Sequence, residues 1–432
     1  MDSDLPEPLP AKPGFLNKNP SLRIREFNLY LALRFGIIFA LNMQSTTIYY
    51  WVYHITNDKL SLGFVGLAEV IPAIGFSFIS GHFVDLNEKR RMVMMCLIGY
   101  ILLAIALFTV ALPSTQENLS LDTSLYLVYF FVFLGGMLRS FYSPSMFALF
   151  GLVVPRQHYP NATSWSSMAW QLGAVLGPLT AGFFIAWQGI SASLLSIVIL
   201  EVILLVPLFG IAVKPILKKA KEPILQSLTE GVRFVMRTPA LLGAQLLDMF
   251  SVLFGGAVAL LPVYQKEILH VNEVGFGILR SAPGIGALCT LGLLAFLPLK
   301  SHPGKKLFGA VAGFALCIIT FGLSKNFYLS FFMLLFSGMF DAVSVVIRST
   351  ILQLVTPDEM RGRVSAVNTM FVSSSNELGD FESGVAAHYL GTVRAVVTGG
   401  CITMGIVLIT FFKAPQLRNF KFEDHMQKPD ES

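Results

Sequence analysis

The stretch Gly135-Gly-Met-Leu-Arg-Ser140 returns 202 positions later as Ser337-Gly-Met-Phe-Asp-Ala342. At the same offset, Leu152-Val-Val-Pro155 returns as Leu354-Val-Thr-Pro357. A third match, at an offset of 211, pairs Gly66, Pro72 and Gly75 with Gly277, Pro283 and Gly286. Three matched stretches in the same order indicate that the chain is built from two repeated halves. Such repeats are typical of transporter folds, in which the substrate site lies near the membrane midplane where the repeats meet.

The composition indicates that most of the chain lies in lipid. Of its 432 residues, 54% are hydrophobic and only 13% are charged, whereas soluble domains average about 25% charged residues. A helix needs about 20 apolar residues to cross a bilayer. Twelve segments meet that need: 27–53, 62–83, 92–112, 123–149, 161–187, 190–212, 239–264, 274–297, 307–324, 327–350, 364–390 and 395–412. The sequence therefore predicts an all-α membrane protein with twelve transmembrane helices, six in each half.

Basic residues decide the orientation of these spans, because cytoplasmic loops are enriched in Lys and Arg. An even number of spans puts both termini on one side of the membrane. If that side is the cytoplasm, the inner loops and tails hold 23 Lys and Arg residues, the outer loops hold four, and another four lie inside spans. We therefore expect an integral protein of the plasma membrane, the inner membrane of a bacterium, with both termini cytoplasmic.

The longest inner connection divides the chain into units. We predict a cytoplasmic N-terminal tail (1–26), an N-terminal six-helix bundle (27–213), a cytoplasmic linker (214–238), a C-terminal six-helix bundle (239–412) and a cytoplasmic C-terminal tail (413–432). Within the linker, residues 227–237 have the pattern of a short amphipathic helix that lies on the anionic inner leaflet.

Several kinds of chemistry have no motif in this sequence. There is no phosphate-binding loop, no Gly-x-Ser-x-Gly elbow, no His-Glu-x-x-His and no Cys-x-x-Cys. The four cysteines lie in apolar segments without metal-ligand or disulfide spacing. The net charge of +5 is concentrated in the inner loops, which argues against a nucleic-acid partner. We expect neither an enzyme nor a bound metal or cofactor.

Four motifs resemble those of the major facilitator superfamily. They are Gly81-His-Phe-Val-Asp85-Leu-Asn-Glu-Lys89-Arg90-Arg91 between spans 2 and 3, Arg139 in span 4, Gly173-Ala-Val-Leu-Gly177-Pro178 in span 5, and Thr356-Pro-Asp-Glu-Met-Arg-Gly-Arg-Val-Ser-Ala-Val-Asn368 with Glu377-Leu-Gly-Asp-Phe-Glu-Ser-Gly384 at span 11. The last is similar to the drug–proton antiporter branch that includes macrolide and enterobactin exporters. The first departs from the family pattern at Glu88, where a glycine is usual. The resemblance implies two six-helix bundles related by a pseudo-twofold axis, a central cavity lined by spans 1, 4, 7 and 10, and a link between Arg139 and proton coupling.

Two of these motifs also have a direct physical interpretation. A carboxylate at the inner end of span 2 accepts hydrogen bonds from a neighbouring helix N-terminus, and such a bond forms in one conformation and breaks in another. The predicted latch comprises Gly81, Asp85, Arg90 and Arg91. The alternative is a solvated loop that follows the charge bias. Small residues let helices approach closely and proline bends a helix, so the predicted packing motif comprises Gly173, Gly177 and Pro178.

Eleven ionisable residues fall inside the predicted spans. Each costs about 2.5–3.5 kcal/mol at a helix centre unless it is paired or hydrated. Such residues mark substrate or proton pathways, or else static ion pairs that fix helix packing. The predicted cavity and coupling residues are Arg34, Glu69, Arg139, Asp248, Arg280, Asp341, Arg348, Glu377 and Asp380. Of the remaining acids, Glu382 points away from the others on span 11, and Glu201 stands alone in span 6, where we expect a structural role.

The repeat gives opposite charges to equivalent positions. Arg139 aligns with Asp341, and Glu69 aligns with Arg280. Because equivalent helices run in the same direction, equivalent positions lie at similar depth. We therefore expect Arg139 and Asp341 to face one cavity from opposite halves and to interact, directly or through water, in at least one state, with Arg348 as the alternative partner of Asp341.

Span 11 carries the strongest candidates for a proton carrier. Glu377 and Asp380 fall on one stripe of the predicted helix, together with Ser373, Gly384 and His388. Two carboxylates one turn apart repel each other when both are ionised, so one is expected to hold a proton near neutral pH. The alternative is that both are structural partners of Arg280 or Arg348.

We interpret the chain as a monomeric secondary active transporter that works by alternating access. It is expected to export a small amphipathic compound, a drug or a siderophore, in exchange for protons. The alternatives are proton-linked uptake and, from a different class, a membrane sensor or assembly protein without flux. Seven desolvated acids argue against the last, since a scaffold has no need of them.

Overall fold

The computed structural model describes residues 19–213, 224–296, 302–357 and 360–422, and these residues form helices and turns without a strand. The N-terminal half consists of η1 (Pro20–Arg23), α2 (Arg25–Thr56), α3 (Lys59–Leu86), α4 (Lys89–Ala111), α5 (Pro113–Gln116), α6 (Leu121–Val153), η2 (Arg156–His158), α7 (Tyr159–Ile203) and α8 (Leu205–Phe209). After α9 (Ile224–Arg237), the C-terminal half consists of α10 (Pro239–Gly255), η3 (Ala257–Leu260), α11 (Leu261–Val263), η4 (Tyr264–Ile268), α12 (Glu273–Phe296), α13 (Pro303–Leu323), α14 (Phe327–Val355), α15 (Arg361–Leu390), α16 (Thr392–Lys413) and α17 (Pro415–Arg418).

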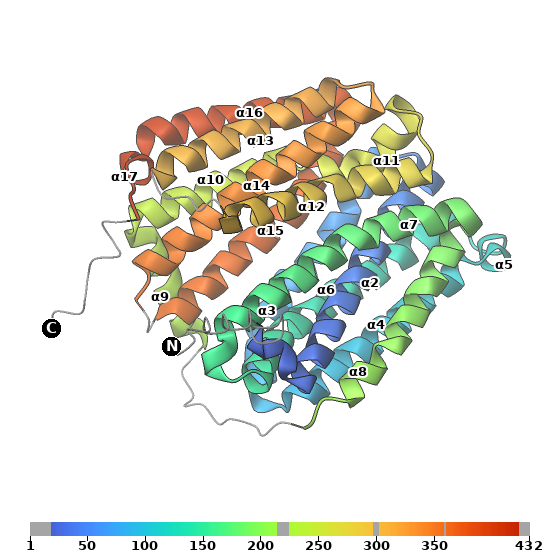
Figure 1. The fold of residues 1–432 in the computed structure, drawn as a ribbon. Helices are drawn as coiled ribbons and strands as arrows, with labels where there is room; N and C mark the ends of the chain where they lie inside the picture. The colour runs from blue at the N-terminus through green and yellow to red at the C-terminus, as the bar shows by residue number, and fades with distance from the viewer. Residues whose placement is uncertain (1–18, 214–223, 297–301, 358–359, 423–432) are drawn as a thin grey trace, which may run out of the picture.

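Ten helical stretches of the described residues are long and apolar enough to cross a membrane. One of them, 161–209, contains two spans, because Gln188 and Gly189 leave helical geometry where the chain turns back. Gly189 has a φ of 81°, which glycine adopts without steric penalty. α15 runs beside the other long helices but is too polar to count among the ten (Figure 1). With these two corrections, the predicted class of twelve membrane helices in two halves is confirmed.

Polar caps set the starts of several helices. Asp58 begins α3 by accepting hydrogen bonds from the amides of Leu60 and Ser61, and Asn326 begins α14 by accepting one from the Leu329 amide. As a result α3 runs a few residues beyond the apolar segment that predicted it. One expected span differs in form: 239–264 is not one continuous helix, because the backbone leaves helical geometry at Gly256.

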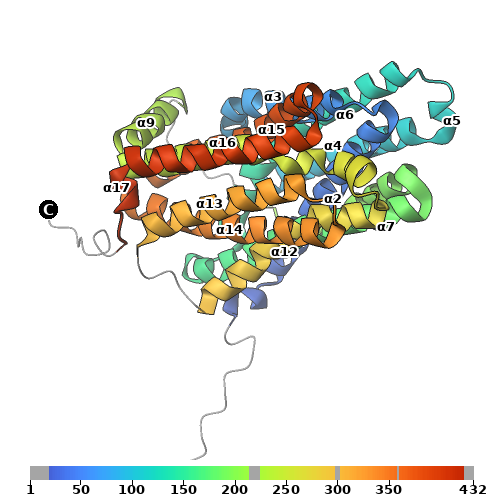
Figure 2. The ribbon, with the colours of Figure 1, turned by 90° about the horizontal axis from the view of Figure 1, so that it is seen from above.

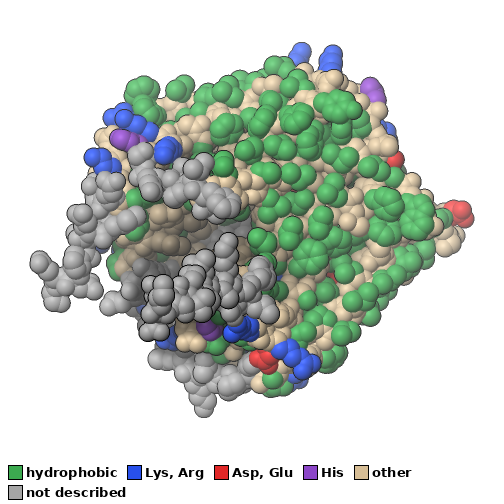
Figure 3. All heavy atoms as spheres, viewed as in Figure 1, with side chains coloured by type: hydrophobic (Ala, Val, Ile, Leu, Met, Phe, Trp, Pro, Cys, Tyr) green, Lys and Arg blue, Asp and Glu red, His purple; other side chains and the backbone are tan. Residues whose placement is uncertain are grey.

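The two halves lie beside each other and meet along two pairs of helices. α3 packs against α15, and α7 packs against α12. In Figure 1 the N-terminal half is below and the C-terminal half is above, with the long helices of both running in roughly one direction. Hydrophobic side chains cover the broad middle of this face, and charged side chains gather toward its margins (Figure 3). This distribution is what a lipid-facing belt between two polar interfaces requires.

The end of the molecule opposite the chain termini joins the halves. One core cluster there combines Tyr49 and Tyr53 of α2 with Leu260, Tyr264 and Phe276 of the C-terminal half. Polar contacts reinforce the joint: the Tyr50 hydroxyl donates to Glu273 at 2.9 Å, and Lys59 lies 3.4 Å from Glu267. This end is therefore closed.

The end that carries the termini is built differently. One buried cluster there takes residues only from 27–211, and another takes residues only from 235–422. No shared core joins them among the described residues, and the surface is hollowed between the halves at this end (Figure 3). The space between the halves therefore opens toward the end that carries the termini.

The linker helix α9 is attached to the C-terminal half at this open end (Figure 2). Arg363 of α15 donates to Glu230 of α9 at 2.5 Å. A Cβ added at Gly231 would lie 2.9 Å from the Arg363 carbonyl oxygen, so only glycine permits this close approach. The position of this helix on the inner leaflet, like the domain boundaries, stays a prediction.

We predict that Lys219 and Arg361 face the cytoplasm and that Asn118 faces outward. Asn118 follows α5, which Figure 1 places at the end opposite the termini; Lys219 and the Arg361 side chain lie outside the described residues. Single cysteines at the three positions should be labelled by an impermeant thiol reagent on intact cells only at position 118. Labelling of position 219 from outside would reverse the orientation.

Candidate functional site

An ion network crosses the interface between the halves. Arg139 of α6 donates to Glu69 of α3 at 2.6 Å and to Glu377 of α15 at 2.8 Å. Glu69 and Arg139 belong to the N-terminal half, and Glu377 belongs to the C-terminal half. The Glu377 side chain is 9% exposed, whereas that of Arg139 is 44% exposed. Arg139 is therefore a charged link between the halves.

Close packing of α3 on α15 brings these groups together. A Cβ added at Gly66 would lie 2.8 Å from the Glu377 carbonyl oxygen and 2.9 Å from the Asp380 Cβ. The absence of a side chain at Gly66 lets the two backbones approach until Glu69, one turn further along α3, reaches the same arginine as Glu377. The glycine that the repeat singled out thus positions the network.

A second group of polar residues continues the network. The Tyr49 hydroxyl of α2 donates to Asp380 of α15 at 2.5 Å. The Arg280 guanidinium of α12 lies 4.8 Å from the centre of the Tyr49 ring and donates to Ser45 at 3.2 Å. Asp380 and Glu69 lie within electrostatic range of Arg280. Tyr49 therefore contacts one acid and one arginine of the opposite half.

One oxygen of this network has no partner. Glu377 Oε1 accepts from Arg139, but Glu377 Oε2 is buried and no described group donates to it. A buried carboxylate oxygen without a donor is costly. Protonation would remove the net charge of this carboxylate, and the resulting O–H group would then need an acceptor.

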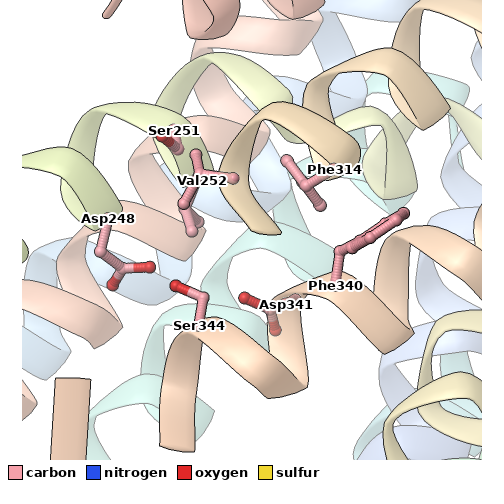
Figure 4. A pocket seen from close by; sticks show the side chains of 8 residues that line it. Asp248, Ser251, Val252, Phe314, Phe340, Asp341 and Ser344 are labelled. Carbon is pink, nitrogen blue, oxygen red and sulfur yellow. The ribbon is translucent and has the colours of Figure 1, made fainter. Parts of the chain in front are cut away.

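The charges of the C-terminal half form a separate group. Arg348 pairs with Asp248, both side chains being 7% exposed, and its Nε donates to Ser344 at 3.2 Å. Asp341 lies one turn before Ser344, within electrostatic range of Arg348. Figure 4 shows Asp341 on the wall of a pocket between α10, α13 and α14.

The predicted interaction of Arg139 with Asp341 is therefore not made in this conformation, and its formation in another state stays a prediction. Arg139 is turned toward α3 and α15, whereas Asp341 is turned toward α10 and α13. The alternative partner is also not paired with Asp341, because Arg348 bonds to Asp248. The repeat predicted similar depth for Arg139 and Asp341, but it did not predict in which direction each side chain projects from its helix.

The remaining charged residues lie apart from both groups. Arg34 donates to the Ser166 carbonyl at 3.1 Å. Glu201 is buried, and its Oε2 has no donor among the described residues. His388, on the same stripe of span 11 as Glu377 and Asp380, is 43% exposed and lies 3.3 Å from Asp58 at the closed end.

The loop of the predicted latch shows why glycine is not needed at position 88. The Glu88 carboxylate caps α4 by accepting from the amides of Arg90 and Arg91 at 3.0 and 2.7 Å. Lys89 folds back onto the last turn of α3 through the Val84 carbonyl. The Arg90 guanidinium lies 5.9 Å from the Phe209 ring centre. The side chains at 81 and 85 lie outside the described residues, so the latch stays a prediction.

We expect Asp85→Asn to slow transport severalfold while leaving the folded protein in the membrane. An amide loses the charge that favours a helix N-terminus and an arginine partner. Initial rates normalised to protein in the membrane test this, with Asn87→Ala in the same loop as the control. If Asp85→Asn transports at the wild-type rate, Asp85 is a solvated loop residue and not part of a latch.

The predicted packing motif lies where α7 meets α2. A Cβ at Gly173 would lie 2.9 Å from the Phe35 carbonyl oxygen, and a Cβ at Gly177 would lie 2.7 Å from that of Phe39. Pro178 stands inside α7, and its carbonyl oxygen would lie 2.7 Å from a Cβ at Gly277 of α12. The motif therefore packs α7 on both α2 and the opposite half.

Comparisons with known proteins agree with this architecture. The sequence pattern of the Major Facilitator Superfamily matches residues 30–379. The chain is 25% identical over 425 residues to the enterobactin exporter EntS of Shigella boydii, covering 94% of this chain and 95% of that protein. It is 24% identical over 418 residues to EntS of Citrobacter koseri, with the same coverage.

Solved structures share the fold at low identity. A POT family transporter in complex with a thioalcohol-conjugated peptide superimposes with a TM-score of 0.72 at 14% identity, covering 91% of this chain and 96% of that one. A D-xylose–proton symporter gives 0.71 at 13% identity, covering 91% and 99%. A bacterial homologue of the lysosomal transporter Spinster, described as inward-facing and unoccupied, gives 0.69 at 15% identity, covering 94% and 99%.

Proposed function

Because the chain belongs to the Major Facilitator Superfamily, we propose that it is a transporter that exports a small amphipathic compound in exchange for protons. It is an integral membrane protein, and we place it in the plasma membrane, the inner membrane of a bacterium, as a monomer with both termini cytoplasmic. The space between the halves then opens to the cytoplasm, from which an exporter loads its cargo.

Our proposal of proton coupling rests on the unpaired oxygen of Glu377. A carboxylate with one oxygen on Arg139 and the other buried without a donor has a place for one proton. The formal charge supports this: Glu69, Glu377 and Asp380 face two arginines, so one proton makes the group neutral. A site that becomes neutral loses the cost of an uncompensated charge in low dielectric.

Protonation would also change the contact between the halves. Neutral Glu377 attracts Arg139 less strongly than ionised Glu377, because the bond loses its charge-assisted character. Glu69, within the same half as Arg139, is then the only ionised partner of Arg139 in the network described by these bonds. One proton on Glu377 therefore weakens an ionic link between the halves, and this couples proton binding to their relative movement.

The direction and the cargo are supported by the relatives. The EntS proteins are named as enterobactin exporters and match nearly the whole chain. At 25% identity this supports export of a siderophore-like or drug-like compound by this chain. It is also consistent with the resemblance of the segment at span 11 to the drug–proton antiporter branch.

A panel of antibiotics and siderophores in an efflux-deficient host tests this function. With the gene present, at least one compound should become less toxic, or one siderophore should appear faster in the medium, and an uncoupler should remove the effect. A host carrying Glu377→Gln is the matched control. Greater accumulation of a compound inside the cells would favour proton-linked uptake. No change for any compound would favour a protein without flux.

A further inference from the structure

Three tyrosines near the end of α2 each donate a hydroxyl proton to a carboxylate of the C-terminal half. The pairs are Tyr49 with Asp380, Tyr50 with Glu273, and Tyr53 with Glu267. Tyr49 differs from the other two, because its ring also faces an arginine, and the Arg280 Cζ lies 4.8 Å from the ring centre. Tyr49, from the N-terminal half, thus contacts two opposite charges of the C-terminal half at once.

Neutral groups hold the Arg280 guanidinium. It donates to the Ser45 hydroxyl at 3.2 Å and to the Val258 carbonyl at 3.4 Å. Ser45 lies one turn before Tyr49, so one face of α2 supplies both the hydroxyl and the ring. Among the described residues, no ion pair joins Arg280 to a carboxylate, although Asp380 lies within electrostatic range. An arginine and an aspartate of the same half are therefore near each other without being bonded.

Both charged residues approach the same segment, η3, from different helices. Arg280 of α12 reaches η3 through its hydrogen bond to a backbone carbonyl. Helix α15 packs on η3, and Ser383, three residues after Asp380, donates to the Gly256 carbonyl at 2.9 Å. These contacts lie within the C-terminal half, whereas Tyr49 belongs to the other half. A separation of the halves at the closed end would therefore remove Tyr49 and leave the two charges beside each other.

We propose that Tyr49 is a positioning residue that keeps Arg280 and Asp380 apart while this end is closed, and that the two charges pair directly when it opens. The inference rests on the proposed transport function, because that function requires a second conformation. A bond between two ionised groups is stronger than a bond from either of them to a neutral partner. Opening would then exchange contacts across the halves for an ion pair within one half, which lowers the free energy of the open state.

The rate of thiol labelling at the closed end measures how often this end opens. The four natural cysteines are replaced by alanine, and Gln265→Cys supplies the only thiol, because Gln265 is buried beside His54 of the opposite half. The purified protein is labelled with N-ethylmaleimide in the absence of cargo. We expect Tyr49→Phe to raise the rate about tenfold, since the ring stays but the closed state loses a hydrogen bond to a carboxylate. If Gln265→Cys does not fold, His54→Cys, across the same contact, replaces it as the probe.

Two variants made in the Tyr49→Phe protein test the ion pair. Arg280→Gln should lower the labelling rate at least about threefold, because the open state loses the pair. Without that pair, Arg280→Gln would remove contacts of the closed state only and would raise the rate. Asp380→Asn should lower the rate to a similar extent, and both changes together should lower it no further than either alone, since they remove one shared interaction.

Tyr50 provides the matched control. Tyr50→Phe removes the same kind of bond at the same end, but the Tyr50 ring is stacked on His54 at 4.0 Å and not on an arginine. Adding Glu273→Gln to Tyr50→Phe should therefore change the labelling rate by less than about twofold.

Two results would overturn the proposal. One is a labelling rate that rises or stays the same when Arg280→Gln is added to Tyr49→Phe. The other is a pair of effects, from Arg280→Gln and Asp380→Asn, that add up in the combined variant. Neither measurement requires cargo, so both are distinguishable from a failure of the proposed function. A protein that exports but shows either result loses only the switch, and a protein that shows the expected rates but exports nothing loses only the transport function.

Discussion

Glu377→Gln is expected to abolish accumulation driven by a pH gradient while preserving downhill exchange of the cargo. Glutamine keeps the size of the side chain and an oxygen that accepts from Arg139, but it cannot take up a proton. Uncoupling should lower accumulation in proteoliposomes at least tenfold. Counterflow, which needs cargo binding and movement of the halves but no net proton transfer, should stay within about threefold of the wild type.

The controls separate Glu377 from other acids of the chain. Glu201→Gln changes a buried acid in α7 that makes no contact with the network among the described residues, so accumulation should survive. Asp380→Asn keeps an oxygen for the Tyr49 hydroxyl and tests the neighbouring acid. If Glu377→Gln and Asp380→Asn both still build a gradient, the coupling acid is elsewhere, and Glu69 and Asp341 are the next candidates.

The fold was predictable because its signals extend over the whole chain. The bias of 23 inner to four outer basic residues, the internal repeat and twelve apolar segments are redundant, so one irregular span does not change the result. The details that differ are local. α7 is one long helix until Gly189 turns it back, because glycine adopts a positive φ that apolar patterning does not reveal. Residues 239–264 are interrupted at Gly256, and the apolar pattern gives no sign of this break.

The site was predictable by residue but not by partner. Glu69, Arg139, Glu377, Asp380 and Arg280 were singled out because charge is rare in membrane helices, and the structure groups them. Their pairing depends on how each helix is rotated about its axis, and the repeat carries no information on that. The structure adds Tyr49 to the network. In the sequence Tyr49 belongs to an aromatic run near the end of α2, and such a run is typical of residues at the membrane–water interface.

Removing either member of the Arg348–Asp248 pair is expected to cost about 3–5 kcal/mol of stability. Both side chains are 7% exposed, so the partner left behind is a charge without compensation in a low-dielectric interior. Arg348→Ala leaves two aspartates, Asp248 and Asp341, facing each other across the same region. We therefore expect Arg348→Ala to be at least as damaging as Asp248→Ala, in thermal unfolding of the purified protein at neutral pH.

Two further variants test whether the Arg348–Asp248 pair itself is responsible for the loss of stability. Arg394→Ala, which changes an exposed arginine of the opposite end, should alter stability by less than about 0.5 kcal/mol. The double variant Asp248→Leu with Arg348→Met removes both charges and fills the space with apolar groups, so it should be more stable than either single variant. If the stability lost in the double variant equals the sum of the stabilities lost in the two single variants, each side chain acts independently.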